Sequence, residues 1–339
     1  MEKKLLEVKN LKVSFYTHVG EVKAVNDISF DLGYGEILGI VGESGSGKSV
    51  TSYSIIGLID APGKVKDGSI LFDGKNLLEY DEKAMQSIRG NDISMIFQDP
   101  MTSLNPVFKI GNQMVEGILR HQNLSRQQAR KRAIELLDLV GIPSPEKRLK
   151  QYPHEFSGGM RQRVMIAMAL SCCNKLVIAD EPTTALDVTI QAQILELMKD
   201  LKKKINMSII LITHDLGIIS DLCDRVIVMY AGKIVEEANI NDIFYNPKHP
   251  YTWGLLRSIP KLTADGHERL IPIEGHPVDL LNPPEGCSFA PRCEHCMKIC
   301  LDKEPPFISV SDTHKSACWL LHPDNPHGLD KKEAEDNNG

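Results

Sequence analysis

The sequence predicts an α/β protein with a largely parallel core sheet, an antiparallel β side sheet, a helical insert and a small Cys-rich C-terminal domain. Three observations support this fold class. Short, continuously apolar runs alternate with helical patterns, which is typical of strands buried on both faces of a parallel sheet. Other β-rich runs are broken at glycine, as in hairpins. Finally, five of the eight cysteines lie between Cys287 and Cys318.

Composition narrows the class of protein. A length of 339 residues favours one large domain and a smaller one, and 42% hydrophobic with 25% charged residues is typical of soluble globular proteins. A net charge of −6 argues against a dedicated nucleic-acid binder. No uncharged apolar run reaches the ~18 residues of a membrane span. The charged N-terminus, "MEKKLLEVKNLKVSF", does not resemble a secretory signal, so we expect a cytoplasmic chain.

Each sheet is predicted from its own pattern. Buried parallel strands are expected in "EILGIVG" (36–42), "KLVIADEP" (175–182) and "MSIILITHD" (207–215). We expect the antiparallel side sheet to contain the first 35 residues, residues 69–74 and residues 226–237.

The middle of the chain reads as helical between about 108 and 155. "SRQQARKRAIELLDLVGI" begins at Ser125, a candidate N-cap, and stops at Gly141. Ala133, Leu137 and Val140 share one apolar face. After about residue 240 the composition shifts to Pro, His and Cys. We therefore predict domains at 1–240, with a helical insert at about 100–165, and at 241–325, followed by a disordered tail at 326–339.

A phosphate-binding loop is indicated by "GESGSGKS" (42–49), which follows a buried strand and precedes a helix. Its glycines let successive N–H groups point at phosphate oxygens, and the helix N-terminus favours negative charge. Lys48 supplies a positive charge, and Ser49 a hydroxyl ligand for Mg²⁺. The alternative is a Gly/Ser linker, but its place between strand and helix favours phosphate binding. The candidate nucleotide contacts are Gly42, Ser44, Gly45, Ser46, Gly47, Lys48, Ser49 and Val50.

Two carboxylates end the strand in "LVIADEP". Adjacent strand residues point to opposite sides, so Asp180 and Glu181 should have different roles. Asp180 suits the surroundings of Mg²⁺, and Glu181 could orient or deprotonate an attacking water. Solvated acids in a strand-end turn are the alternative, which the phosphate-binding loop disfavours.

"FSGGMRQR" (156–163) offers a second anion site at a helix N-terminus, formed by Ser157, Gly158 and Gly159. An ordinary N-capped helix would show the same pattern. One nucleotide needs only one phosphate cradle in its own chain, so a second cradle suggests that a γ-phosphate arrives from another subunit.

Residues 5 to 240 resemble the ATP-binding cassette (ABC) ATPases. "GESGSGKS" resembles Walker A, "LVIAD" with Glu181 resembles Walker B and its catalytic glutamate, and "FSGGM" resembles the signature motif. Gln98 in "MIFQDP", Asp187 in "TALD" and His214 in "LITHD" are similar to the Q-loop, D-loop and switch histidine. The resemblance implies catalytic Glu181, His214 and Gln98, and Mg²⁺ held by Ser49, Gln98 and Asp180. A base-stacking aromatic is expected at Phe15 or Tyr16.

The implied mechanism is a head-to-tail dimer in which ATP on Lys48 and Ser49 is closed over by Ser157 and Gly159 of the partner. "FQDPMTSLNP", "NPKHPYTWGLL" and "NPPEGCSFAPRC" resemble ATPase subunits of dipeptide/oligopeptide and nickel importers, the first motif resembling the first of two paired ATPases. The resemblance implies a sister ATPase subunit (heterodimer), two membrane permeases, an external peptide-binding protein and a peripheral place on the cytoplasmic side of the membrane. His249, Pro250 and Tyr251 are interpreted as tail packing.

Other functions compete with this interpretation. A nickel importer shares the same motifs, and a soluble cassette ATPase could act on nucleic acid or ribosomes. A third alternative is a regulatory binding module with vestigial turnover, which the intact Lys48, Asp180, Glu181 and His214 disfavour.

The clustered cysteines have spacings x5, x2, x3 and x17 from Cys287 to Cys318. In a reduced cytoplasm such a cluster favours metal over disulfides, and the spacing leaves zinc and iron–sulfur open. Buried free thiols are the third alternative. The importer resemblance implies a [4Fe–4S] cluster on Cys287, Cys293, Cys300 and Cys318, with Cys296 as an extra thiol. We expect such a cluster to hold a tail with little core of its own.

Overall fold

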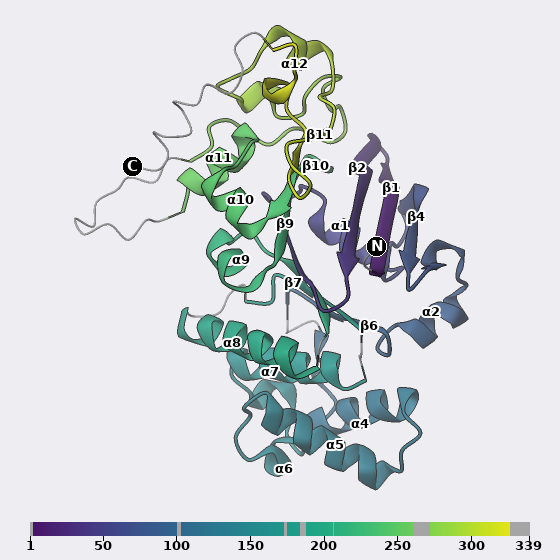
Figure 1. Cartoon of the computed structure of the whole chain (residues 1–339). Helices are drawn as coiled ribbons and strands as arrows, with labels where there is room; N and C mark the ends of the chain where they lie inside the picture. The colour runs from purple at the N-terminus through teal and green to yellow at the C-terminus, as the bar shows by residue number, and fades with distance from the viewer. Residues whose placement is uncertain are drawn as a thin grey trace, which may run out of the picture. The chain divides into compact units, whose positions relative to one another are not determined.

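The computed structural model describes residues 3–99, 103–172, 175–183, 188–205, 207–259 and 272–325, with only the main chain at 201–205 (Figure 1). The chain forms two compact units. The first unit contains Met1–Leu5, Leu32–Ile37 and Asp73–Ile212, and the second contains Leu6–Asp31, Leu38–Phe72 and Thr213–Gly339. The expected disordered tail at 326–339 and the candidate residue Asp187 lie outside the described residues.

The first unit contains three parallel strands in the order β8-β7-β6. The central strand, β7 (Leu176–Asp180), pairs with β6 (Ile93–Ile96) on one side and β8 (Ser208–Ile212) on the other. All residues of β7 and β8 are buried, as their continuous apolar runs predict. The strands predicted within 175–182 and 207–215 are thereby confirmed.

Helices make up most of the rest of the first unit. They are α2 (Glu82–Ile88), α4 (Ile110–His121), α5 (Arg126–Leu139), α6 (Pro145–Arg148), α7 (Gly158–Leu170) and α8 (Val188–Ile205). Helix α5 packs against α4, α6 and α7 (Figure 1).

The predicted boundaries of helix α5 are confirmed. Ser125 caps it in a capping box with Gln128, and the chain leaves it through Gly141 at φ 73°. The expected face of Ala133, Leu137 and Val140 is fully buried.

The second unit contains an antiparallel sheet and part of a mixed one. In the antiparallel sheet β1 (Lys4–Thr17) lies between β2 (Gly20–Gly33) and β4 (Gly63–Phe72). The short strand β5 (Lys75–Asn76) belongs to the first unit. In the mixed sheet β3 (Ile37–Val41) pairs parallel with β9 (Arg225–Tyr230), which pairs antiparallel with β10 (Lys233–Asn239).

The prediction that residues 226–237 belong to the antiparallel side sheet is wrong. They form β9 and most of β10, which join the sheet of β3. Five of the six residues of β9 are buried, which suits a strand inside the core sheet. The hairpin predicted at the glycine break is present, but its glycine does not reveal which sheet the hairpin joins.

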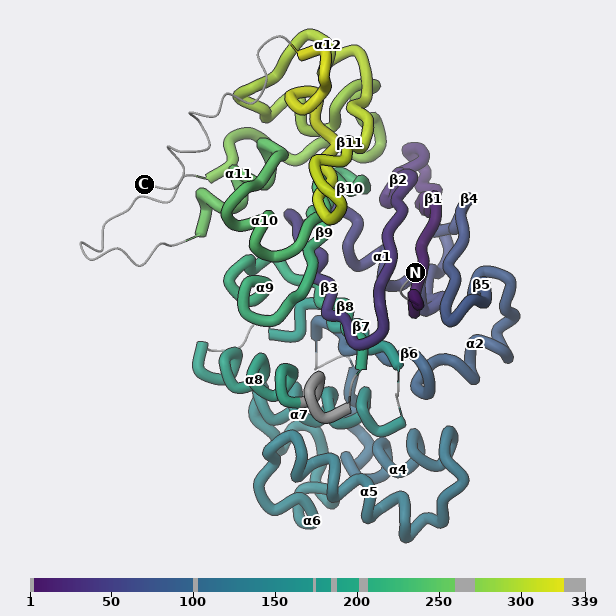
Figure 2. The backbone as a smooth tube through the Cα atoms, in the orientation of Figure 1, coloured from purple at the N-terminus to yellow at the C-terminus, as the bar shows by residue number. Residues whose placement is uncertain are grey.

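The C-terminal region adds to the same sheet. Its hairpin of β11 (Ile308–Ser309) and β12 (Lys315–Ser316) pairs with β10, as Figure 2 shows. The remaining helices of this unit are α1 (Lys48–Ile55), α9 (Leu216–Leu222), α10 (Ile240–Tyr245), α11 (Pro250–Arg257) and α12 (Lys298–Asp302). Short 3-10 turns occur in the first unit at Leu77–Glu79 and Pro153–Glu155, and in the second unit at Ala290–Arg292 and Trp319–Leu321.

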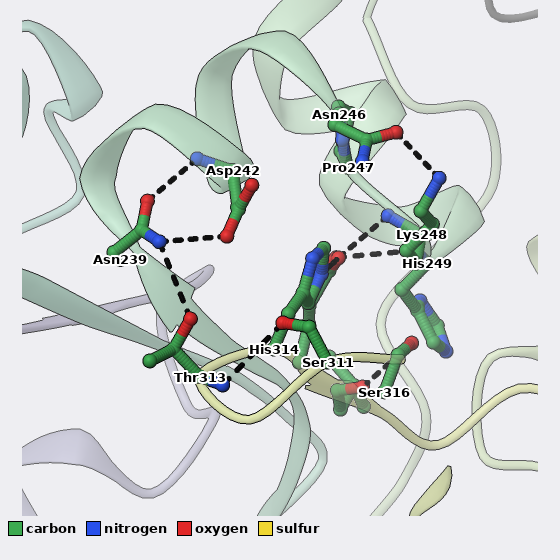
Figure 3. Close-up of polar contacts among 12 residues, drawn as sticks. Asn239, Asp242, Asn246, Pro247, Lys248, His249, Ser311, Thr313, His314 and Ser316 are labelled. Atoms are coloured by element: carbon green, nitrogen blue, oxygen red, sulfur yellow. Dashed lines mark hydrogen bonds and ion pairs between the residues drawn. The ribbon is translucent and has the colours of Figure 1, made fainter. Parts of the chain in front are cut away.

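A buried carboxylate ties the C-terminal region to strand β10 (Figure 3). Glu236 is fully buried and accepts hydrogen bonds from the backbone N–H groups of Lys248 (2.5 Å) and His249 (3.1 Å). Its Oε1 also lies 2.7 Å from Nε2 of His314, which is itself buried. Buried polar contacts therefore join the C-terminal region to β10, and the sequence patterns did not indicate them.

None of the helices in the part of the chain that the structure describes combines the length and the apolar character that a membrane span requires.

Candidate active site

The phosphate-binding loop of the second unit runs from the end of β3 to the start of α1. Gly47 precedes α1 with φ 98°, and a Cβ at this position would stand 2.5 Å from the carbonyl oxygen of Ala24. At Gly42, with φ 149°, a Cβ would stand 2.1 Å from the carbonyl oxygen of Met229. Only glycine satisfies both the left-handed backbone and the close approach, so these positions have a structural reason for their residue type.

Lys48 lies curled inside this loop. Its Nζ donates to the carbonyl oxygens of Gly42 and Glu43, both at 2.8 Å, and lies 3.4 Å from Oγ of Ser46. The side chain is only 6% exposed. A cation held at a helix N-terminus is suited to binding phosphate oxygens.

The other predicted contacts of this loop differ in exposure. Ser44 and Gly45 form an exposed tip, and Ser46 is buried. Ser49 and Val50, in the first turn of α1, are half-buried. The loop thus presents its tip to solvent and keeps its lysine inside.

The two candidate carboxylates stand at the end of β7 in the first unit. Asp180 is the last strand residue and is 1% exposed, whereas Glu181 is half-buried. Glu181 follows the strand and adopts φ 47°, which is uncommon for a non-glycine residue. The two side chains therefore differ in exposure, and Glu181 stands at a left-handed turn directly after the strand.

Gln98 and Glu181 are brought together. The amide Nε2 of Gln98 donates to Oε2 of Glu181 at 2.7 Å, across 83 residues of sequence. Sequence reasoning gave these residues separate roles and did not predict a contact between them. A strained backbone with a charge-assisted hydrogen bond at an exposed strand end is a common feature of functional sites.

The residues predicted to form a second anion site lie at a helix N-terminus. Ser157 caps α7, its Oγ accepting from the backbone N–H of Met160 at 3.4 Å. Gly158 and Gly159 form the first turn, and a Cβ on Gly159 would stand 2.6 Å from Ile190. Ser157 is exposed, so its hydroxyl is accessible.

The remaining candidates of the second unit differ in exposure. His214 is exposed and immediately precedes Asp215, whose side chain caps α9. Tyr16 is 44% exposed, whereas Phe15 is half-buried beside Gly63. Of the two aromatic rings, that of Tyr16 has the more accessible face.

Four of the five clustered cysteines line one small cavity of the second unit, together with Phe289, Ala290 and Leu320. They are Cys287, Cys293, Cys300 and Cys318. Burial raises the pKa of the Cys293 and Cys318 thiols to about 12. Cys296 is exposed and does not line the cavity. Within the described ranges, no three His, Cys, Asp or Glu side chains are grouped so that they could hold a metal ion.

Two residues that sequence reasoning did not assign to the site contact the phosphate-binding loop. Tyr251, interpreted as tail packing, is indeed fully buried, and His249 caps its helix. The Tyr251 hydroxyl also accepts a hydrogen bond from the backbone N–H of Glu43 at 2.8 Å. Arg292 forms an ion pair with the Glu43 carboxylate. A buried tyrosine signals that its hydroxyl has a partner, but no sequence pattern indicates which one.

Family models match two parts of the chain. Residues 25–184 match the family described as "ABC transporter". Residues 235–300 match "Oligopeptide/dipeptide transporter, C-terminal region". The second match begins near the predicted boundary at about 240.

Whole-length relatives show the same combination. The chain is 62% identical over 324 residues to the oligopeptide transport ATP-binding protein OppD of Bacillus subtilis, covering 95% of this chain and 90% of the relative. It is 56% identical to the dipeptide transport ATP-binding protein DppD of the same organism, covering 98% of this chain and 99% of the relative. Identity to OppD of Escherichia coli is 52%, with 93% of each chain covered.

Solved structures agree with the fold. A dimeric ATP-binding cassette in a post-hydrolysis state, bound to ADP and Pi, is 27% identical with a TM-score of 0.62 and covers 69% of this chain and 98% of its own. The cbiO1 subunit of Clostridium perfringens is 29% identical with a TM-score of 0.62, covering 72% and 92%. The chain therefore belongs to the ABC transporter ATPases that carry an oligopeptide/dipeptide transporter C-terminal region.

Proposed function

We propose that this ATPase drives the uptake of dipeptides or oligopeptides through partner permeases. The observation that carries the proposal is whole-length identity of 52–62% to oligopeptide transport ATP-binding proteins, with the C-terminal region included. The intact phosphate-binding loop also supports ATP hydrolysis, because Lys48 is held inside the loop by hydrogen bonds to the carbonyl oxygens of Gly42 and Glu43.

Each residue has a proposed role in hydrolysis. Lys48 and the loop amides bind the β and γ phosphates, and Tyr16 stacks on the base. Mg²⁺ would be held by oxygen ligands from Ser49, Asp180 and Gln98, and it neutralises charge on the phosphates. Glu181 orients the attacking water, and His214 contacts the γ-phosphate. The carboxylate of Asp180 is an oxygen ligand of the kind that Mg²⁺ prefers.

We propose that the active form is a heterodimer with a sister ATPase, docked on two permeases at the cytoplasmic side of the membrane and supplied by an external peptide-binding protein. Ser157, Gly158 and Gly159 of one subunit would close over the partner's nucleotide, and Asp187 would reach across the interface. The exposed hydroxyl of Ser157 at the start of α7 supports this role.

A transport assay tests the proposal. A strain that lacks this chain should fail to grow when a required amino acid is supplied only as a peptide, and wild-type protein should restore growth. Glu181→Gln should accumulate to the same level and not restore growth. Normal peptide uptake in the deletion strain would contradict the proposal. Loss of ⁶³Ni²⁺ uptake instead would favour a nickel importer, and co-sedimentation with ribosomes would favour a soluble cassette ATPase.

We also propose that the four cavity-lining thiols, Cys287, Cys293, Cys300 and Cys318, hold a [4Fe–4S] cluster. Their shared cavity and the separate, exposed position of Cys296 support this set over any other four.

Metal analysis tests the cluster. Anaerobically purified protein should be brown and contain about four irons per chain. Cys296→Ser should keep this iron, and Cys293→Ser should lose it. Colourless protein with one zinc and no iron would contradict the cluster but not a metal site.

A further inference from the structure

Glu43, the second residue of the phosphate-binding loop, is held from the C-terminal region. Arg292 donates two parallel hydrogen bonds to the Glu43 carboxylate, from Nη1 to Oε2 at 2.6 Å and from Nη2 to Oε1 at 3.0 Å. The backbone N–H of Glu43 donates to the Tyr251 hydroxyl at 2.8 Å. Both the side chain and the main chain of one loop residue are therefore fixed by residues more than 200 positions away.

The two anchors are themselves rigidly placed. The Arg292 side chain is 3% exposed and also donates to the carbonyl oxygens of Glu274 (2.9 Å) and Ile273 (3.2 Å) and to the Tyr230 hydroxyl (3.4 Å). The Tyr251 ring is fully buried and packs on Tyr230, with centroids 4.7 Å apart. A guanidinium with this many hydrogen-bond partners is held in one orientation, and it therefore fixes the position of the Glu43 carboxylate.

Glu43 passes this constraint to the phosphate-binding groups. Its carbonyl oxygen accepts from Lys48 Nζ at 2.8 Å and from the backbone N–H of Ser46 at 3.2 Å. Lys48 is the cation of the loop, and Ser46 lies between Glu43 and Lys48 in the loop. A shift of Glu43 would move the carbonyl oxygen to which both residues donate.

We propose that Arg292 and Tyr251 are positioning residues for ATP binding, which hold Glu43 so that Lys48 and the loop amides stand ready for the phosphates. The C-terminal region is then a part of the nucleotide-binding apparatus. The competing explanation is that the Arg292–Glu43 pair only stabilises the C-terminal region.

The test compares Arg292→Ala, Arg292→Lys and Tyr251→Phe with the wild-type chain. We expect Arg292→Ala to raise KM and Kd for ATP by about tenfold or more, because a nearly buried ion pair loses one partner. The value of kcat should change less, since the groups that act on water are untouched. Arg292→Lys should recover part of the affinity, and Tyr251→Phe should weaken binding by a smaller factor.

Two further variants separate positioning from stability. Arg257→Ala breaks an exposed ion pair with Glu294 in the same region and should leave KM unchanged. In a cycle with Glu43→Gln, the Arg292→Ala change should have little further effect on Kd, since Glu43 is its target on the loop.

An Arg292→Ala protein with wild-type KM and Kd, whatever its melting temperature, would overturn the proposal. If Arg292→Ala does not fold, Glu43→Gln and Tyr251→Phe decide the question, because each keeps the size of the side chain. Wild-type ATP affinity in both of them would equally overturn it.

Discussion

The phosphate-binding loop and the strand-end carboxylates are built in opposite ways. The loop is fixed from several sides: its glycines lie against carbonyl oxygens, Lys48 is bonded inside it, and Glu43 is held by Arg292 and Tyr251. At the end of β7, Gln98 donates a hydrogen bond to Glu181 at an exposed position, and the Glu181 backbone lies in the left-handed region.

This difference suggests that the loop determines the affinity for ATP and that the strand-end residues determine the rate of hydrolysis. A rigid loop can bind phosphates without reorganising, which lowers the entropic penalty of binding. Glu181 instead accepts a hydrogen bond from Gln98. In the proposed mechanism, this bond gives way to one from the attacking water. We therefore expect changes at the loop to alter affinity and changes at Glu181 or Gln98 to alter turnover.

The largest expected effect is on turnover in Glu181→Gln. Loss of a group that orients or deprotonates water should lower kcat by about 10²–10⁴-fold, while Mg-ATP affinity stays close to wild type. The variant should accumulate as an ATP-bound dimer, which size-exclusion chromatography with Mg-ATP would detect. Turnover near the wild-type rate would remove Glu181 from the mechanism.

The next effect concerns the loop. Gly47→Ala forces a Cβ to within 2.5 Å of a carbonyl oxygen at φ 98°, so the loop should not close and ATP binding should be lost. Gly45→Ala is a matched control, because its φ is 78° but its Cβ meets nothing within 4 Å.

Left-handed strain alone should cost Gly45→Ala about 1–2 kcal/mol. Thermal unfolding without nucleotide should therefore show a larger loss of stability in Gly47→Ala than in Gly45→Ala. Equal losses in the two variants would show that the close approach at Gly47 is unimportant.

A smaller effect is expected for Gln98. Gln98→Ala removes a proposed oxygen ligand of Mg²⁺, so it should lower kcat by about tenfold or more with little change in ATP affinity. Gln98→Glu keeps an oxygen ligand for Mg²⁺ but loses the donor to Glu181. If it turns over as slowly as the alanine variant, the contact matters; if it matches wild type, only Mg²⁺ ligation does.

The smallest effect is expected for Ser157→Arg. The altered cradle would serve the partner's nucleotide, so ATP affinity of the isolated subunit should not change, while turnover of the assembled dimer should fall. Nucleotide titration of the isolated chain measures this. A large loss of affinity there would contradict a nucleotide shared between subunits.

Local patterns predicted much of the fold. Strands β3, β7 and β8 follow from continuous apolar runs, and helix α5 from the Ser125 cap and Gly141. The sheet that β9 joins was mispredicted, because strand pairing is decided by partners distant in sequence. The same reason explains the contacts that were missed: Gln98 and Glu181 are 83 residues apart, and Glu43 and Arg292 are 249 apart.

The most direct test of the contrast is a pair of crystal structures of the wild-type chain, one without nucleotide and one with Mg²⁺ and a non-hydrolysable ATP analogue. We predict that the backbone of residues 42–49 and the Glu43–Arg292 bonds are the same in both, while the bond from Gln98 to Glu181 is present without nucleotide and broken with it. A loop that rearranges on binding while the bond from Gln98 to Glu181 persists would contradict the account.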